Sequence, residues 1–314
     1  MFRHIPSLPA SLLLFAVAVP ALSAPHTVSL QRQDERLPTP LLKHGAPEQG
    51  NAGGLLASCL VRFALGDLKG AEKACEEVIA LDPGRADAFK LRGYVYLIEQ
   101  RYERANADFR AAMHLKPADD QAVAGYAQSL SDMGQYSAAV AQFHKALTLA
   151  PEKPAYWNGL CWSLGATGKG LTEALTACNK ALRIEPEAAA AYNSRGLVHL
   201  RMQRFATAIA DYTRSLRLSP DQSSARFGLG LAKLFKGEWD GARDIRQARR
   251  LDPGIDRLFV GMGVLPEQCG LTAMRSCPPG FPPMAAPSPV DPVIAKLQGP
   301  RRQEIMRMAG LFPR

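Results

Sequence analysis

The sequence predicts an all-α protein in which six pairs of helices stack side by side as a solenoid. A tripeptide ending in proline recurs six times, beginning with Leu81-Asp82-Pro83. Its prolines stand 33 to 35 residues apart, at Pro83, Pro117, Pro151, Pro186, Pro220 and Pro253. Two further landmarks keep this spacing. One is an alanine shortly before each proline, at Ala71, Ala105, Ala139, Ala174, Ala208 and Ala242, and the other is a small residue earlier in the unit, at Gly93, Ala127, Gly196 and Gly230.

Each unit has the residue pattern of two helices joined by a turn. In the third unit, Ala139, Phe143 and Ala146 recur at helical spacing. The proline ends the second helix, because the residue before a proline is driven out of the α conformation. Glycine tolerates the positive φ of tight turns, and it stands at the expected turns as Gly66, Gly134, Gly168 and Gly237.

This period and pattern resemble the tetratricopeptide repeat, a helix-turn-helix unit of about 34 residues. The best matches are Phe89-Lys90-Leu91-Arg92-Gly93-Tyr94-Val95-Tyr96 with Ala105 and Phe109, and Tyr192-Asn193-Ser194-Arg195-Gly196-Leu197 with Ala208 and Tyr212. The resemblance covers residues 52–254 and implies a right-handed solenoid of six repeats. Two units depart from the pattern: the fourth has an extra residue in its turn, and the sixth has Arg246 at the aromatic position.

The N-terminal residues have the pattern of an export signal. A short positive region at Arg3 and His4 precedes an apolar run from Leu8 to Val19, and small residues up to Ala24 follow. We therefore expect residues 1–24 to be a cleaved signal peptide. The alternative is an uncleaved membrane anchor, for which the apolar run is short. Residues 25–51 are polar and rich in proline, and we interpret them as a flexible arm.

The C-terminal residues divide into two parts. Residues 255–265 carry apolar side chains at helical spacing, which predicts a capping helix after the sixth repeat. Residues 266–314 form a proline-rich, basic tail. Its last stretch, 301–311, is amphipathic and basic. One interpretation is a helix that docks on a partner or on an anionic membrane surface. The alternative is a frayed end of the chain.

The six cysteines follow the repeat register. Cys59 and Cys161 take the position of the small residue in other units. Cys75 and Cys178 take the position of the aromatics Phe109, Phe143 and Tyr212. Because an exported chain reaches an oxidising compartment, this matched register predicts the disulfides Cys59–Cys75 and Cys161–Cys178, with buried thiols as the alternative. Cys269 and Cys277, in the proline-rich tail, are expected to form a third disulfide.

The sequence contains no arrangement of residues that predicts catalysis. It lacks the metalloprotease, phosphate-loop and nucleophile-elbow motifs, and we expect no cofactor and no metal. The net charge is +9, but basic runs interleaved with aromatics are missing, so we expect no nucleic-acid partner. His199 stands where the family often has tyrosine, and a packed core histidine is expected there.

The resemblance implies that the first helix of each unit lines a concave groove. A polypeptide partner would contact the apolar and aromatic residues of these helices. Those residues are Leu56, Leu60, Phe63, Lys90, Tyr94, Leu97, Ile98, Asn158, Trp162, Asn193, Leu197, Phe227 and Leu231. The alternatives are that some of them belong to the core, or that the chain's own tail covers them.

Together these features predict a periplasmic or secreted scaffold that binds a peptide or helix of another envelope protein. The competing hypothesis is an envelope-surface binder, in which the basic tail contacts anionic lipid or cell-wall polymer and the repeats act as a spacer. The pattern leaves the oligomeric state open.

Overall fold

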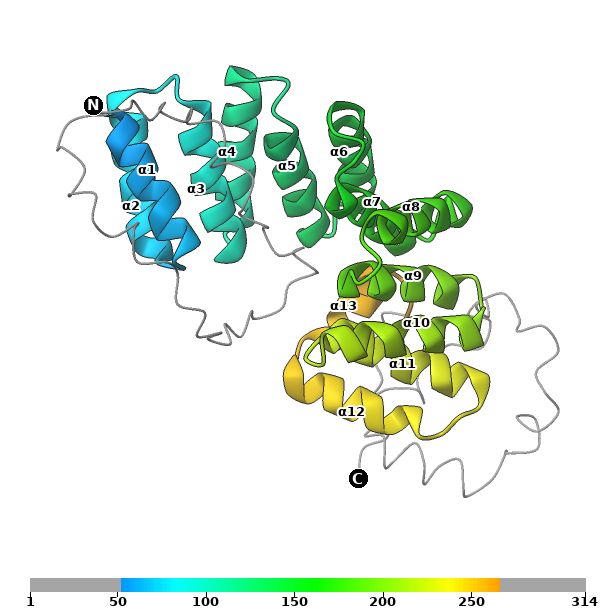
Figure 1. Ribbon diagram of the computed structural model, residues 1–314. Coiled ribbons are helices and arrows are strands. Elements are labelled where there is room, and N and C mark those ends of the chain that lie inside the picture. Colours follow the sequence, from blue (N-terminus) through cyan, green and yellow to red (C-terminus); the bar gives the residue numbers. More distant parts are fainter. Residues whose placement is uncertain (1–51, 266–314) are drawn as a thin grey trace, which may run out of the picture.

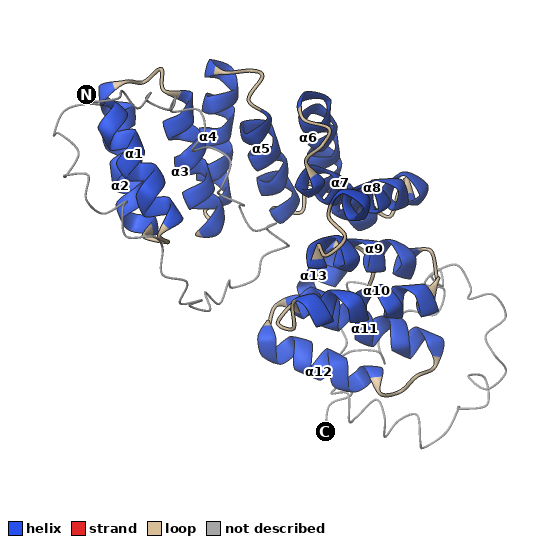
Figure 2. Ribbon diagram, in the orientation of Figure 1, coloured by secondary structure: helices blue, strands red, loops and turns tan. Residues whose placement is uncertain are grey.

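The computed structural model describes residues 52–265, which form thirteen α-helices (Figures 1 and 2). The predicted signal peptide, the N-terminal arm and the proline-rich tail, with Cys269 and Cys277, lie outside the described residues. The first helices of the six units are α1 Ala52–Ala64, α3 Ala86–Ile98, α5 Asp120–Asp132, α7 Pro154–Thr167, α9 Ala189–Arg201 and α11 Ser223–Lys236. The second helices are α2 Leu68–Leu81, α4 Tyr102–Leu115, α6 Tyr136–Leu149, α8 Leu171–Ile184, α10 Phe205–Leu218 and α12 Gly241–Leu251, and α13 Ile255–Gly261 follows. The predicted all-α, right-handed solenoid is confirmed.

Local chemistry sets the ends of these helices. In each unit the second helix ends at the leucine or isoleucine that stands two residues before the repeated proline. Asp119 caps α5 by accepting hydrogen bonds from the backbone N–H groups of Gln121 and Ala122, both at 3.1 Å. The turns inside four of the units carry glycine at positive φ, as predicted. In the other two units Gln100 and Gln203 take φ values of 59° and 58°, so the turn geometry is kept without glycine.

Aromatic rings lock neighbouring units together. The ring of Phe109 lies between Gly93 of its own unit and Gly125 of the next, where added Cβ atoms would stand 2.9 and 2.4 Å from it. Tyr212 lies in the same way between Gly196 and Gly228, at 2.8 and 2.3 Å. Since real Cβ atoms do not approach this closely, the glycines are needed for the rings to be buried.

Disulfides replace the ring in two units. Cys59–Cys75 joins α1 to α2 and Cys161–Cys178 joins α7 to α8, with Cα–Cα distances of 5.4 and 5.2 Å. These are the two pairings that the repeat register predicts. Where an aromatic ring would need glycine in the following unit, the chain has Leu91 after the first disulfide and Ser194 after the second. The smaller bridge therefore coincides with a larger neighbour.

The first helices lie on the inner side of the superhelix. Each contacts the first helix of the next unit, with α7 and α9 packed most closely. Val198 Cγ2 lies 3.2 Å from where a Cβ on Gly165 would stand. The direction of the helices changes at this point. In Figure 1, α1 to α6 stand upright in the view, while α9 to α12 lie across it.

The chain after the sixth unit folds back over the inner side. Phe259 of α13 packs on Phe227 of α11, with ring centroids 4.6 Å apart. Arg201 at the end of α9 donates hydrogen bonds to the carbonyls of Ala166 and Met262. Trp162, Leu197, Leu231 and residues 262–265 join the same apolar cluster. The concave face is therefore covered over α7, α9 and α11.

Candidate functional site

The part of the concave face that stays uncovered lies on α1, α3 and α5, and we call it the open groove. It is built from residues that recur at the 34-residue spacing, so that Leu60, Tyr94 and Gln128 are equivalent and Ile98 is equivalent to Asp132. The rings of Phe63 and Tyr94 lie 6.5 Å apart. The residues of the open groove are all partly exposed, and they are Leu56, Leu60, Phe63, Tyr94, Ile98, Gln128 and Asp132.

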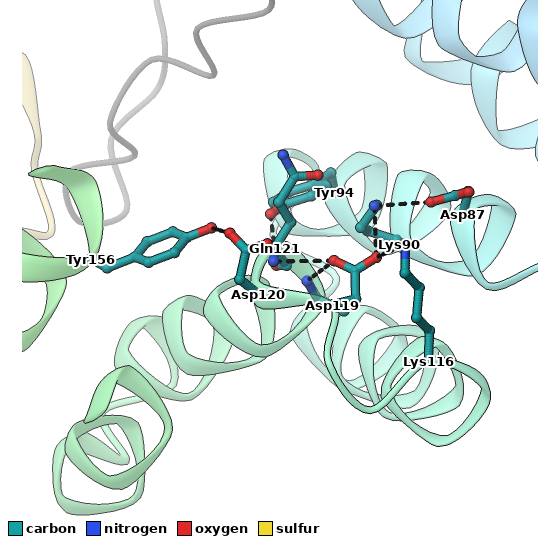
Figure 3. Close-up of polar contacts among 9 residues, drawn as sticks. Asp87, Lys90, Tyr94, Lys116, Asp119, Asp120, Gln121 and Tyr156 are labelled. Carbon is teal, nitrogen blue, oxygen red and sulfur yellow. Dashed lines mark hydrogen bonds and ion pairs between the residues drawn. The ribbon is translucent and has the colours of Figure 1, made fainter. Parts of the chain in front are cut away.

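Tyr94 is held rigidly in this groove. Its ring meets that of Phe109 edge to face, with centroids 5.1 Å apart. Its hydroxyl donates a hydrogen bond of 2.9 Å to the backbone carbonyl of Gln121 (Figure 3). Burial of this hydroxyl raises the pKa of Tyr94 well above its ordinary value. The side chain therefore stays neutral and keeps a fixed orientation.

A buried ion pair lies beside Tyr94 and joins α3 to the start of α5. Lys90 Nζ is 2.9 Å from Asp119 Oδ2 and 3.0 Å from Asp87 Oδ1 (Figure 3). Burial by itself raises the pKa of Asp119, but the hydrogen bond and charge of Lys90, with the hydrogen bond from the Ala122 N–H and the charge of Lys116, together outweigh it, so that this pKa lies below its ordinary value. Burial likewise lowers the pKa of Lys90, but the hydrogen bonds to Asp119 and Asp87 and the charges of these two carboxylates together outweigh it and raise that pKa. Lys90 is thus a structural cation that fixes the register of two units.

Two acidic side chains of α5 face this region without a cation. Asp120 accepts a hydrogen bond of 2.7 Å from the hydroxyl of Tyr156 on α7 (Figure 3). Asp132, at the other end of α5, accepts one of 2.8 Å from Gln128 Nε2. No lysine or arginine within residues 52–265 forms an ion pair with either carboxylate. Burial raises the pKa of Asp132 to about 7, so this carboxylate gains from a cationic partner.

The structure divides the predicted groove residues into two sets. Leu56, Leu60, Phe63, Tyr94 and Ile98 remain partly exposed. Seven of the other eight are buried, and Asn158 is partly exposed but already hydrogen-bonded within the fold. Buried residues are Leu97, Trp162, Leu197, Phe227 and Leu231, all at 9% exposure or below, together with Lys90 and Asn193, and half-buried Asn158 accepts a hydrogen bond from Ser194.

Physical reasons for this burial differ along the chain. Leu97 packs with Phe109 inside the second unit. Asn193 donates a hydrogen bond to Ser224, which occupies the amide that a peptide backbone would have used. Trp162, Leu197, Phe227 and Leu231 lie in the cluster that α13 and residues 262–265 complete. For these residues the alternatives of core packing and coverage by the chain itself apply.

Sequence reasoning missed the contribution of the third unit. Gln128 and Asp132 are neither apolar nor aromatic, and a search for apolar anchors therefore passed over them. The repeat spacing could have identified both residues, because they stand 34 residues after Tyr94 and Ile98. The pairing of Tyr156 with Asp120 spans two units and had no signal in the repeat.

The described helices show two further absences. None between residues 52 and 265 is long and apolar enough to cross a membrane. In the same part of the chain no group of three or more His, Cys, Asp or Glu side chains is placed to hold a metal ion.

Known proteins share the repeat and the fold. Profiles of the tetratricopeptide repeat match residues 57–120, 162–223 and 193–254, and residues 96–160. Over 231 residues the chain is 24% identical to the mitochondrial import receptor subunit TOM70 of Homo sapiens, covering 70% of this chain and 38% of that protein. It is 24% identical over 193 residues to tetratricopeptide repeat protein 6 of Homo sapiens, covering 59% and 36%. The chain thus spans well under half the length of these curated relatives.

Two solved structures show the same fold. The APC/C hetero-tetramer Cut9–Hcn1 superposes with a TM-score of 0.59 at 15% identity, covering 68% of this chain and 42% of that chain. PilF of Pseudomonas aeruginosa superposes with a TM-score of 0.52 at 18% identity, covering 65% and 92%. The repeat profiles run along the six helix pairs described above, and the chain belongs to the tetratricopeptide-repeat family.

Proposed function

We propose that this protein is an exported scaffold that binds a short apolar or amphipathic segment of another envelope protein in the open groove. Tetratricopeptide-repeat proteins mediate protein–protein interactions and are generally non-enzymatic scaffolds. The observation that carries the proposal is the cluster of partly exposed apolar side chains on α1, α3 and α5, on a concave face that is otherwise covered.

The chemistry of the open groove suits a polypeptide. Phe63 and Tyr94 offer aromatic surface, and the fixed ring of Tyr94 loses little conformational entropy on binding. Gln128 and Asp132 add polar atoms at the edge of this apolar surface, where they can accept or donate hydrogen bonds to a bound main chain or side chain. A helix laid in the groove, or an extended segment, would meet both kinds of contact.

Export is supported by two features of the chain. The N-terminal residues have the pattern of a cleaved signal, and two cysteine pairs lie at disulfide distance inside the solenoid. Disulfides persist in oxidising compartments, such as the bacterial periplasm. These features favour a periplasmic or secreted location for the scaffold.

Crosslinking in intact cells tests the proposal. The full-length protein is expected to capture a discrete protein from the envelope fraction, and Tyr94→Ala is expected to abolish this capture. Tyr192→Ala is the matched control, because it removes a partly exposed tyrosine of α9 outside the open groove. Trp162 is not a suitable target, since it is 9% exposed and its loss would disturb the core. Equal capture by both variants would contradict the groove assignment.

A second candidate is binding to an anionic envelope surface. The observation that favours it is the arginine content of α12, where exposed Arg243 and Arg250 have no ion pair with any residue of the described solenoid. Such binding would fall steeply with added salt, whereas capture through the apolar open groove would persist. Measuring capture at low and high salt separates the two candidates.

A further inference from the structure

The C-terminal part of the chain already enters the concave side of the solenoid. Met262 and Gly263 are held by hydrogen bonds from Arg201, and Leu265, the last described residue, is 6% exposed. The following 49 residues, 266–314, start from this position. They therefore begin on the covered part of the concave face, over α7, α9 and α11.

The open groove has a chemistry that lacks a complement within residues 52–265. Its apolar side chains on α1 and α3 are only partly covered, and Asp120 and Asp132 on α5 have no cationic partner there. A half-buried carboxylate without a cation is unfavourable compared with a paired one. A fitting occupant would therefore carry apolar side chains together with arginine or lysine.

Residues 301–311 have this composition. Arg301, Arg302 and Arg307 are interleaved with Ile305 and with the remaining apolar residues Met306, Met308 and Leu311. In a helix, Ile305 and Met308 would share one face, since residues three apart are neighbours. A helix of this length measures about 16 Å, and three adjacent helices spaced by about 8–10 Å span a similar width.

The linker between Leu265 and residues 301–311 is long enough for this segment to reach other parts of the concave face. Residues 266–300 separate the described chain from this segment, and an extended chain covers about 3.3 Å per residue, or roughly 115 Å in all. Because the segment belongs to the same molecule as the open groove, its effective concentration there is on the order of millimolar. Even weak contacts are then sufficient for occupancy.

We propose that residues 301–311 bind in the open groove of the same molecule, with their apolar side chains on Phe63, Tyr94 and Ile98 and an arginine paired with Asp132. The inference rests on the proposed function, because it concerns the same surface. It adds a regulatory consequence: an outside partner must displace the segment, so the tail sets a threshold for partner binding.

Photo-crosslinking of the full-length chain tests this. With p-benzoylphenylalanine in place of Ile305, the expected product is a crosslink within one molecule to a peptide from α1, α3 or α5. The same group in place of Ser288, in the proline-rich stretch, is the control and should give little product there. Asp132→Lys is expected to lower the yield about tenfold, equivalent to about 1.4 kcal/mol. Glu103→Lys, an exposed charge reversal on α4, should leave it unchanged.

Three outcomes would overturn the inference. They are crosslinks to other surfaces, crosslinks that join isotopically light and heavy copies in a mixture, and a yield that does not respond to Asp132→Lys while the variant keeps its melting temperature. Each leaves the proposed function standing, because capture of an envelope protein and its loss in Tyr94→Ala are measured separately. If the inference holds, the full-length Arg301→Glu/Arg302→Glu/Arg307→Glu variant captures more partner than the unaltered chain.

Discussion

His199 is surrounded by charges of both signs in the core of the fifth unit. It is 7% exposed, and its Nε2 lies 3.7 Å from Asp211 Oδ2. That carboxylate already accepts two hydrogen bonds from Arg195, at 2.8 and 2.7 Å. Burial lowers the pKa of His199 from its ordinary 6.5, Asp211 raises it, and Arg195 and Arg204 lower it further. The imidazole is therefore neutral in the folded protein at neutral pH.

This arrangement predicts that His199 lowers stability in mild acid. The folded state holds His199 with a lowered pKa, so the unfolded state binds the proton more readily and the contribution of His199 to stability falls as pH drops below 6.5. Asp132, with a folded-state pKa of about 7, contributes with the opposite sign over this range, so the test compares variants: from pH 7.5 to pH 5.5 the melting temperature of His199→Gln should shift upward relative to that of the unaltered chain. His114→Gln, at an exposed position on α4, should keep the original slope. An unchanged slope in His199→Gln would contradict this account.

The glycines under the aromatic rings allow a second test on single residues. Gly228→Ala would place a Cβ 2.3 Å from the ring of Tyr212, and overpacking of this kind costs about 1–3 kcal/mol. Gly261→Ala is the matched control, since nothing lies within 4 Å of its added Cβ. Urea unfolding should show a large destabilisation for the first variant and almost none for the second. Equal midpoints would show that the ring moves aside freely.

At the scale of helix pairs, the ring and the disulfide are alternative ways to join two helices. Each occupies the same two repeat positions, and each is matched by the residue sixteen positions further on, glycine after a ring and Leu91 or Ser194 after a disulfide. A loop of this size gives on the order of 3 kcal/mol of stabilisation in the chain-entropy model. The unit therefore exchanges aromatic packing for a covalent constraint.

This exchange predicts a coupling between α7, α8 and α9. Cys161→Gly with Cys178→Phe restores the ring pattern, but Ser194 then stands where the ring requires glycine. We expect this variant to melt well below the disulfide-bonded protein, and the further change Ser194→Gly to recover part of the loss. In the unaltered chain, where no ring is present, Ser194→Gly should only destabilise. Calorimetry of the four proteins measures the coupling, and purely additive effects would contradict it.

The helix pairs show how far the sequence alone reaches. The repeat period predicts the ends of the second helices and the partners of Cys59 and Cys161, because these depend on contacts within one unit. It does not predict that Phe227 and Leu231 are buried. Their cover comes from Phe259 and from residues 262–265, which lie after the last repeat and follow no period. The open groove was therefore predicted in part, with Tyr94 and Ile98 placed on it and Gln128 and Asp132 missed.

At the scale of the whole molecule, the solenoid has two ends with different cover on the inner side. Stability in a repeat protein is carried by contacts between neighbouring units. The back-folded chain adds a contact of a different kind, because Phe259 and Met262 join the cluster that contains Trp162 and Leu200. The last three units are thereby held together more firmly than a bare stack would be.

Removing this cover should loosen one end only. Phe259→Ala deletes a fully buried ring, and such losses cost about 3–5 kcal/mol. Hydrogen exchange is expected to speed up in α9, α11 and α13 and to remain unchanged in α1 to α4. Arg257→Ala, an exposed neighbour on the same helix, serves as control. Faster exchange throughout the chain would mean that the solenoid unfolds as a single cooperative body.

The two disulfides each close a loop inside one helix pair, and neither joins one pair to the next. Under tension applied at its two ends, the solenoid would lengthen like a spring whose coils separate one from another. In the two helix pairs that carry a disulfide, the residues between the cysteines cannot be extended by the applied tension. These two pairs would therefore keep their length while the other pairs extend. Oxidation thus limits how far the molecule can be drawn out, and leaves free its small, reversible stretching between units.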